Sequence, residues 1–189
     1  DEAKYDMGFP WLKPDCTADP ANERCANFHF SDPLFEMPIQ LFVRADAEFV
    51  FDSDADIEGK TLCRPKGYYT HDLDAQGRNW IKEGKITLVT PDTPDACFSA
   101  LVAGEVDAVP ENLFLGATLI KDLNLRGKVK ALERPLSKET LHIIVSKKHW
   151  RGTTFMFRIN AGLDAIKASG RYDSIVNKHL AHFMEKLKP

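Results

Sequence analysis

Histidine side chains titrate near neutral pH and bind metals, and six of them are scattered along the chain. Only His179 and His182 have a spacing, three residues apart, that places both rings on one face of a helix. A metal site and a solvated helix surface both explain this pair, and the surface needs no further ligand. The sequence contains no GxSxG, HExxH or phosphate-binding glycine motif and no nucleophile–base pairing. We therefore expect no enzyme activity, no catalytic residues, no metal and no cofactor.

The four cysteines, Cys16, Cys25, Cys63 and Cys97, show neither a CxxC motif nor the Cys/His spacing of a zinc site. Paired in order, Cys16–Cys25 closes a short loop and Cys63–Cys97 ties a strand to the start of a later helix. The loop-entropy model assigns roughly 3 and 4 kcal/mol to these two bridges. Two disulfides fit an oxidising space such as the periplasm, whereas four buried thiols fit a cytosolic protein.

The chain of 189 residues is long enough for one large domain or for two lobes of roughly 100 residues each. Its 25 basic and 28 acidic residues are mixed along the sequence and give a net charge of −3, so no basic stripe is available to bind nucleic acid. No apolar run approaches the ~18 residues that cross a bilayer, and no signal peptide opens the sequence. We expect a soluble protein whose leader, if it is exported, has been removed.

The stretch Arg24–Arg44 organises the chain. A turn at Ser31-Asp32-Pro33 divides it, and Asp32 is explained most simply as a turn residue that bonds local backbone. An apolar run with strand character, Pro38–Val43, follows the turn. The same kind of strand recurs at Leu141–Ser146. One segment that leaves a domain and a matching segment that returns are typical of two lobes that share a double hinge.

Strands alternate with helices along the sequence, which predicts α/β lobes with mainly parallel sheets. We predict strands at 5–11 (ending at Pro10), 39–44, 61–64, 86–89, 106–109, 129–132 and 141–146. We predict helices from Thr93-Pro94-Asp95 to Gly104 and at 111–122, 153–169 and 172–187, with a short helix capped by Thr70 or Asp72. Residues 12–23 are expected to be irregular, with at most one helical turn near 20–24, and 46–56 to be an acidic linker.

The turn and its surroundings resemble the extracytoplasmic solute-binding proteins of polar amino acid ABC transporters, bacterial family 3. The resemblance is carried by Arg24, by Phe30, Ser31, Asp32, Pro33 and Phe35 around the turn, and by the motifs at Glu58–Gly67, Ala100–Val109, Pro135–Glu139 and Ile166–Ile175. It implies the two-lobed type II periplasmic-binding-protein ("venus flytrap") fold. Lobe one is then 1–44 and 141–189, and lobe two is 45–140.

In this family, lobe one begins with a strand, a helix, a strand and a helix before the segment that matches Tyr5–Trp11. The sequence shows none of these four elements, so we expect an incomplete lobe one with an open strand edge and an uncovered apolar face. Either the chain is a fragment whose N-terminal part is elsewhere, or another copy completes the sheet, or lobe one has been rebuilt. We predict that the 189-residue chain by itself self-associates through this lobe.

The resemblance implies that the protein binds a small polar solute, an amino acid or a related carboxylate, between its lobes in the periplasm. It would then deliver the solute to an ABC-transporter membrane permease. One alternative is a periplasmic accessory or sensory module of the same fold that binds a protein partner. Another is a dehydratase, since some proteins of this architecture use cleft carboxylates, for which Glu111 and Asp92 are the acids at hand.

Arg24 falls on the family's arginine that forks the ligand α-carboxylate, a task that suits a permanently charged guanidinium with parallel donors. The alternative is a surface arginine paired with Glu23 or Asp19. Trp11, with Phe9 and Pro10, lies where the family's lobe-one strand contacts the ligand. It therefore either stacks on a ligand or packs in the core.

Gly67, Tyr68, Tyr69 and Thr70 occupy the place of a family glycine and two hydroxyl residues at a helix N-terminus, where backbone N–H groups attract an anion. Two tyrosines in place of Thr or Ser mean that the pocket is filled or is shaped for a planar group. Alternatively, the tyrosines only pack lobe two.

Asn112 stands where the family commonly has the aspartate that takes the ligand α-ammonium, and an amide provides no full countercharge. Glu111 is the neighbouring acid that can substitute. Otherwise both residues only open the next helix, as first-turn and capping residues. Thr93 and Asp92 lie at the opening of a helix that faces the family's cleft, so the resemblance makes both candidate ligand contacts; capping alone also explains Thr93.

Overall fold

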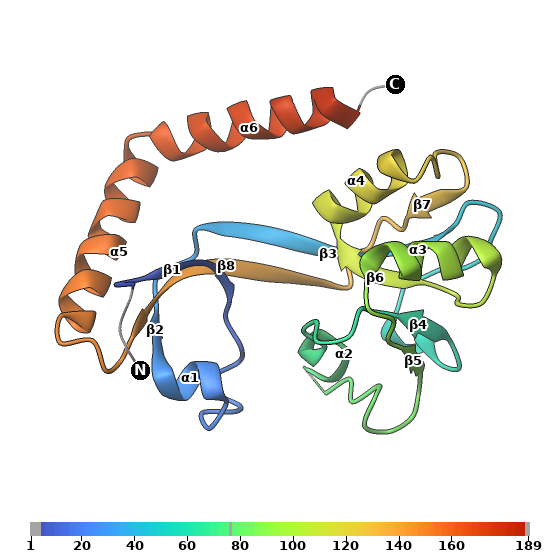
Figure 1. Cartoon of the computed structure of the whole chain (residues 1–189), viewed down its shortest axis with the longest axis horizontal. Helices are drawn as coiled ribbons and strands as arrows, with labels where there is room; N and C mark the ends of the chain where they lie inside the picture. The colour runs from blue at the N-terminus through green and yellow to red at the C-terminus, as the bar shows by residue number, and fades with distance from the viewer. Residues whose placement is uncertain (1–4, 76, 188–189) are drawn as a thin grey trace. The chain divides into compact units, whose positions relative to one another are not determined.

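The computed structural model describes residues 5–75 and 77–187 and divides into two compact units (Figure 1). Unit 1 comprises Asp1–Met37 and Glu139–Pro189, and unit 2 comprises Pro38–Lys138. The division therefore falls after residues 37 and 138, whereas the sequence was expected to divide after 44 and 140.

Two ten-residue strands, β3 (Phe35–Arg44) and β8 (Ser137–Ser146), contain the points where the chain passes from one unit to the other. They are hydrogen-bonded neighbours in one sheet. Both strands are longer than the expected 39–44 and 141–146. Among the added residues, Glu36 and Lys138 are exposed and the others are half-buried, so an apolar run alone does not reveal them.

Unit 1 is built on the later part of β8. The strands β1 (Gly8–Leu12) and β2 (Phe28–Phe30) both pair antiparallel with it, and the short helix α1 (Glu23–Asn27) lies between them in sequence. The expectation that the first strand spans 5–11 and ends at Pro10 is wrong, because β1 continues to Leu12. A proline fits here because β1 is an edge strand with an irregular register between Gly8 and Trp11.

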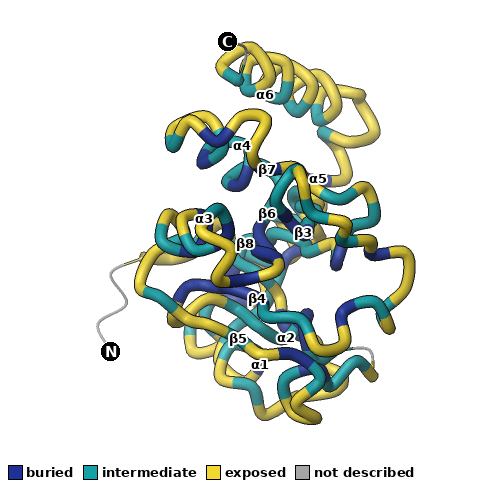
Figure 2. The backbone as a smooth tube through the Cα atoms, turned by 90° about the vertical axis from the view of Figure 1, so that its right-hand side faces the viewer, coloured by how far each residue is buried: buried dark blue, intermediate teal, exposed yellow. Residues whose placement is uncertain are grey.

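Two long helices, α5 (Gly152–Ala168) and α6 (Arg171–Leu187), close unit 1 and are separated near Gly170, as expected. Helix α5 buries Leu163, whereas α6 buries none of its residues, and Figure 2 shows α6 exposed or half-buried throughout. Near its start, the Tyr172 hydroxyl donates a 2.6 Å hydrogen bond to the Leu34 carbonyl.

Unit 2 contains the short 3-10 helix η1 (Asp54–Ile57). Its strands are β4 (Thr61–Cys63), β5 (Thr87–Val89), β6 (Val109–Asn112) and β7 (Val129–Ala131), and its α-helices are α2 (His71–Asp74), α3 (Pro94–Ala103) and α4 (Leu113–Asp122). The strands β6 and β7 pair antiparallel with β3. The strands β4 and β5 pair in parallel, and Leu62 also forms an isolated parallel bridge with Ala108. The expectation of mainly parallel sheets is therefore wrong. The strands that pass between the units are paired with antiparallel partners instead of following helical crossovers.

The position of β6 also differs from the expectation. A strand at 106–109 and a helix from Glu111 were expected, but β6 covers Val109–Asn112 and α4 begins at Leu113. Residues 109–112 pair with β3, with Phe42 opposite Val109. Asp107 lies outside the strand, and its side chain accepts a 2.7 Å hydrogen bond from the Thr61 N–H.

The core of unit 2 packs around Phe42, Phe98 and Leu101, each at most 1% exposed. Helix α4 approaches this core closely at Gly116, because a Cβ there would lie 2.0 Å from the Phe42 ring. Both expected disulfides are present: Cys63–Cys97 joins β4 to α3 inside this core, and Cys16–Cys25 closes the loop before α1. No helix in the part of the chain that the structure describes is long and apolar enough to cross a membrane.

Candidate functional site in unit 2

The turn after β4 holds the sequence-predicted residues Gly67, Tyr68 and Tyr69. Gly67 has a φ of +80°, a left-handed conformation that favours glycine. The Tyr68 N–H donates to the Pro65 carbonyl at 3.1 Å, which tightens the turn. The Tyr69 carbonyl accepts a 2.6 Å hydrogen bond from the Arg64 guanidinium. The shape of the turn is therefore fixed by a buried cation.

Arg64 and Asp72 form a buried ion pair, each 4% exposed. The guanidinium grips the carboxylate with two hydrogen bonds, and the Nη2–Oδ2 distance is 2.9 Å. Its Nε also donates to the Pro110 carbonyl at 3.4 Å. One side chain thus ties together β4, the turn, α2 and β6. Sequence reasoning missed this pair; the available signal was a charged residue directly after the apolar strand Thr61–Cys63.

Glu111 lies in β6 and is 5% exposed, and its carboxylate has fewer hydrogen-bonded oxygens than that of Asp72. Its Oε1 accepts hydrogen bonds from the Asn112 backbone N–H at 2.7 Å and the Asn112 side-chain amide at 2.8 Å. Its Oε2 is buried and has no hydrogen-bond partner among the residues that the structure describes. Burial raises the pKa of the Glu111 carboxyl, although Asn112 and the Arg64 charge act in the opposite direction.

Asn112 uses both ends of its side-chain amide within the protein. Its Oδ1 accepts a 2.8 Å hydrogen bond from the Leu115 N–H and so caps α4, and its Nδ2 donates to Glu111. The capping role weighed from the sequence is therefore present in the structure. Glu111, in contrast, belongs to a strand and not to the first turn of the helix.

Tyr68 is exposed, unlike Arg64 and Glu111, and 44% of its surface is accessible to solvent. Burial of the rest of the residue raises the pKa of its hydroxyl, and the nearby charges of Glu111 and Asp95 raise it further. The Tyr69 ring packs on His71, with 4.0 Å between the ring centroids. One tyrosine thus faces solvent within electrostatic range of two acids, and the other packs inside unit 2.

Thr93 caps α3, because its Oγ1 accepts a 3.3 Å hydrogen bond from the Ala96 N–H. Asp92 and Thr93 are both exposed. Capping accounts for Thr93 in the structure, and a contact with ligand stays a prediction.

Unit 1 contains the other predicted residues, Arg24 and Trp11, which lie side by side. The Arg24 guanidinium carbon is 5.2 Å from the centroid of the Trp11 ring, and its Nη1 donates to the Leu12 carbonyl at 3.3 Å. The Trp11 ring also packs on Phe28, with centroids 5.6 Å apart. Arg24 therefore packs over an indole, an arrangement that holds the guanidinium in one orientation.

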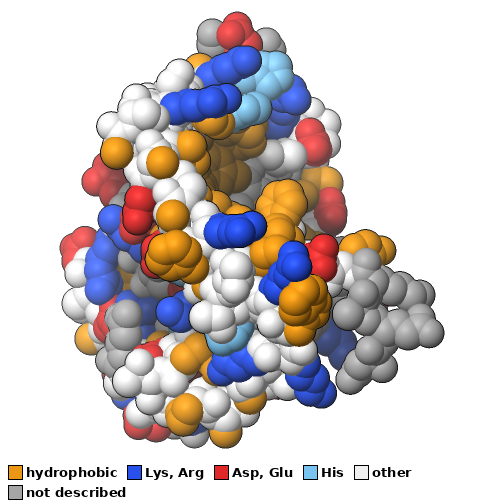
Figure 3. Space-filling model, turned by 90° about the vertical axis from the view of Figure 1, so that its left-hand side faces the viewer, with side chains coloured by type: hydrophobic (Ala, Val, Ile, Leu, Met, Phe, Trp, Pro, Cys, Tyr) orange, Lys and Arg blue, Asp and Glu red, His pale blue; other side chains and the backbone are white. Residues whose placement is uncertain are grey.

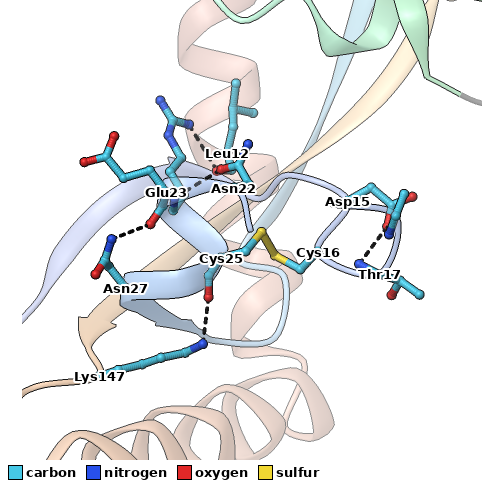
Figure 4. The surroundings of a disulfide bond; sticks show 11 residues. Leu12, Asp15, Cys16, Thr17, Asn22, Glu23, Cys25, Asn27 and Lys147 are labelled. Carbon is cyan, nitrogen blue, oxygen red and sulfur yellow. Dashed lines mark hydrogen bonds between the residues drawn. A yellow bond between two sulfur atoms is a disulfide. The ribbon is translucent and has the colours of Figure 1, made fainter. Parts of the chain in front are cut away.

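A disulfide and several hydrogen bonds between side chains and the backbone fix α1, the helix that carries Arg24 (Figure 4). The Asn22 side chain accepts a 3.1 Å hydrogen bond from the Arg24 N–H and caps the helix. Lys147 donates a 2.7 Å hydrogen bond to the Cys25 carbonyl and so ties the helix to the residue that follows β8. The five-residue helix is too short to be stable alone, so these links position the arginine.

A separate pocket of about 290 Å³ lies in unit 2, and its lining does not include Glu111 or Tyr68. Its lining residues are Asp54, Ala55, Ile57, Glu58, Gly77, Arg78, Trp80 and Lys85. Burial alone would raise the pKa of Asp54, but hydrogen bonds from Arg78 and Arg134 lower it overall. None of the sequence motifs predicted this pocket.

The structure shows no grouping of three or more His, Cys, Asp or Glu side chains that could hold a metal within 5–75 and 77–187. His179 and His182 are both exposed on α6. The exposed positions fit the solvated surface weighed from the sequence.

The model of one protein family, bacterial extracellular solute-binding proteins, family 3, matches residues 16–182. The chain therefore belongs to this family, as the resemblance predicted. No curated protein sequence matches it. The family's description places its members outside the cytoplasm, and the family consists of binding proteins.

Solved structures show the same fold. One is a mutant of ArgBP from T. maritima, with 26% sequence identity, a TM-score of 0.68 and coverage of 94% of this chain and 70% of that chain. Another is an ancestral arginine-binding protein bound to arginine, with 26% identity, a TM-score of 0.62 and coverage of 83% and 66%. A histidine kinase sensor domain with similarity to periplasmic binding proteins has 18% identity, a TM-score of 0.69 and coverage of 93% and 70%.

The fold is thus the mixed α/β type II periplasmic-binding-protein fold. The chain spans about two thirds of the length of the solved arginine-binding proteins that it resembles. The incomplete lobe and the self-association expected from the sequence stay predictions.

Proposed function

We propose that this chain binds a small polar solute, an amino acid or a related carboxylate, in the periplasm and delivers it to the permease of an ABC transporter. The observation that carries the proposal is the buried Glu111 carboxyl, with one unpartnered oxygen, in a chain that belongs to a solute-binding family. Two disulfides fit the oxidising compartment. Similarity to arginine-binding proteins at 26% identity supports an amino acid as the solute class.

Each candidate residue has a proposed task. Arg24 binds the solute carboxylate, and Trp11, which holds the guanidinium in place, provides an apolar surface beside it. In unit 2, the backbone of the turn at Gly67–Thr70 provides N–H donors, and Tyr68 provides a ring and a hydroxyl. Tyr69, Thr93 and Asn112 support these groups through packing and capping.

A thermal-shift screen of the amino acids and of simple dicarboxylates tests the proposal. A solute present at a hundred times its Kd adds about 2.7 kcal/mol to the free energy of unfolding, which raises Tm by several degrees. Arg24→Ala is expected to abolish the shift, whereas the matched variant Arg126→Ala, which removes an exposed arginine of unit 2, is expected to keep it. If no compound raises the Tm of the wild-type protein, the proposal is wrong.

The apolar surface of unit 1 favours a second candidate, an accessory or sensory module that binds a protein partner. Trp150 is 80% exposed and Phe157 is 75% exposed, and large exposed apolar residues are typical of interaction surfaces. Figure 3 shows apolar side chains at the surface among lysine and arginine side chains. Under this candidate, no small molecule raises Tm. Light scattering that shows a mass above the monomer would indicate that the partner is a second copy.

A further inference from the structure

The stretch 147–163, which leads from the end of β8 into α5, carries several positive charges and no negative charge. It contains Lys147, Lys148, Arg151 and Arg158, and it has no aspartate or glutamate. The chain as a whole has a net charge of −3. An anionic surface therefore repels the molecule as a whole and attracts it locally at this stretch.

Two exposed aromatic side chains belong to this stretch, and an arginine follows each of them. Trp150 is 80% exposed and Phe157 is 75% exposed, and Arg151 and Arg158 are exposed as well. The two pairs are about two helical turns apart, so they lie along one side of α5 and of the turn that precedes it. On the side of the molecule that Figure 3 shows, apolar side chains adjoin lysine and arginine side chains.

The turn before α5 holds the Trp150 ring in place. The Arg151 guanidinium carbon lies 4.1 Å from the centroid of this ring, and the His149 ring stacks beside it with 6.5 Å between centroids. The Arg151 backbone N–H donates a 3.0 Å hydrogen bond to His149 Nδ1, so His149 Nε2 carries the proton that is donated to the Asp6 carboxylate at 3.1 Å. The exposed indole is therefore already oriented and loses little conformational freedom when it meets a partner.

An anionic lipid surface fits these features better than a protein surface does. The aromatic anchors of protein interfaces fill well-packed pockets on the partner, whereas a layer of lipid headgroups accepts protruding rings without a matching pocket. Tryptophan and phenylalanine beside lysine and arginine are typical of segments that lie in the membrane interface. Positive charge of one sign, with no acid among it, complements a surface of lipid phosphates.

We propose that the stretch 147–163 docks unit 1 reversibly on the anionic phospholipid surface of a membrane. The rings of Trp150 and Phe157 lie among the lipid headgroups. The guanidinium groups of Arg151 and Arg158 bind the lipid phosphates beside them. This docking goes beyond the proposed function and needs no solute. It keeps the protein at the surface where a membrane permease is met.

Co-sedimentation of the full chain with lipid vesicles tests the proposal. One set of vesicles is phosphatidylcholine alone, and the other contains about 30% phosphatidylglycerol as the anionic lipid. We expect binding to the anionic vesicles and little binding to the neutral ones. We also expect salt at about 0.5 M to release the protein, because the screening length is then only a few ångströms.

A pair of charge variants locates the surface. Arg151→Gln combined with Arg158→Gln is expected to weaken binding to the anionic vesicles by about 25-fold, because each cation near an anionic bilayer contributes about fivefold. Arg126→Gln combined with Lys128→Gln removes the same charge from exposed positions of unit 2 and is the matched control. We expect this control to bind like the wild type.

Aromatic variants test whether the rings enter the membrane. Trp150→Ala combined with Phe157→Ala keeps every charge and is expected to weaken binding by at least about tenfold, because two apolar side chains then stay in water. Lipids with brominated acyl chains quench the fluorescence of an indole that enters the bilayer. We expect such quenching in the wild type and its loss in Trp150→Phe, which keeps a ring at this position. Trp80 is 2% exposed and provides an unquenched reference.

Equal binding to neutral and anionic vesicles would overturn the inference, as would unchanged binding in the double arginine variant or in the double aromatic variant. Absence of binding to both kinds of vesicle would overturn it as well and would favour a protein as the partner of these rings. If a variant does not fold, the comparison of the two vesicles with the wild-type protein still decides the question. The thermal-shift screen of solutes is separate, so failure of the docking leaves the proposed function intact.

Discussion

The two units differ in how they treat their apolar side chains, although they are of similar length. Among the described residues, unit 1 has four buried apolar residues and unit 2 has 21. Conversely, unit 1 has seven of the ten large apolar side chains that are exposed: Tyr5, Met7, Phe9, Trp150, Phe157, Ile175 and Met184. Unit 2 therefore has a core of its own, whereas much of the apolar surface of unit 1 is available to another molecule.

The largest expected difference between the units comes from two matched phenylalanine truncations. Phe42→Ala removes a 1% exposed ring from the core of unit 2 and is expected to lower the free energy of unfolding by about 3–5 kcal/mol. Phe157→Ala removes a 75% exposed ring from unit 1 and is expected to change it by less than about 0.5 kcal/mol. Urea unfolding measures both, and similar losses would show that the exposed ring is packed in solution.

The buried ion pair of unit 2 gives an effect of similar size. Arg64→Met leaves Asp72 and Glu111 buried without a counter-charge and is expected to cost about 3–5 kcal/mol. The double variant Arg64→Met, Asp72→Leu is expected to recover much of this loss. Arg44 and Asp46 form an exposed pair at 3.4 Å, so the control Arg44→Met is expected to cost at most about 1 kcal/mol. Equal losses of stability in Arg64→Met and in the control would contradict the buried Arg64–Asp72 ion pair.

The two disulfides allow a smaller comparison. Cys63–Cys97 spans 34 residues in unit 2 and Cys16–Cys25 spans 9 in unit 1. Replacement of both cysteines by alanine is expected to cost about 4 kcal/mol for the longer loop and about 3 kcal/mol for the shorter one. Chemical unfolding of the two double variants provides the test. If removal of Cys16–Cys25 costs more free energy of unfolding than removal of Cys63–Cys97, this disulfide stabilises parts of unit 1 beyond the loop that it closes.

Local sequence signals predicted some elements well. Helix α3 has a threonine cap followed by Pro94 and ends at Gly104, so both of its ends were visible in the sequence. In contrast, the position of β6 depends on its pairing with β3, which is distant in sequence, and the predicted strand was three residues early. A ladder between distant strands fixes such a boundary, and no local pattern reports it.

Some features of the candidate site could likewise be predicted from local sequence, and others could not. The capping role of Asn112 could be weighed from its place before an apolar helix. The unpartnered oxygen of the buried Glu111 could not be predicted, because it depends on the pairing of Arg64 with Asp72 and on burial of all three residues. The adjacency of Arg24 and Trp11 is likewise tertiary, since 12 residues separate Arg24 from its hydrogen-bond partner Leu12.

The smallest expected effects are those of pH, which acts in opposite directions on one buried group in each unit. Burial raises the folded-state pKa of Glu111 above its ordinary value of 4.5, so the stabilisation by its proton is lost as pH rises above this value. Burial lowers the folded-state pKa of His142 below 6.5, so the unfolded chain binds a proton first and stability falls as pH falls below 6.5. His142 is 2% exposed and bonds the Ser31 carbonyl at 2.6 Å.

Unfolding of Glu111→Gln and His142→Gln against pH separates these two contributions. Relative to Glu111→Gln, the wild type is expected to lose stability as pH rises. Relative to His142→Gln, it is expected to gain stability as pH rises toward 6.5. Parallel pH profiles for wild type and either variant would mean that the corresponding group does not titrate on folding.

The most direct test of the central claim, that unit 2 contributes a charged solute site around Glu111, is a nuclear magnetic resonance titration of labelled protein with the amino acid that gives the largest thermal shift. We expect the amide resonances of residues 67–70, 109, 111 and 112 to move in proportion to site occupancy, and to stay fixed in Glu111→Gln at the same concentration. Shifts confined to the pocket lined by Asp54 and Trp80, with 67–70 and 109–112 unmoved, would contradict it.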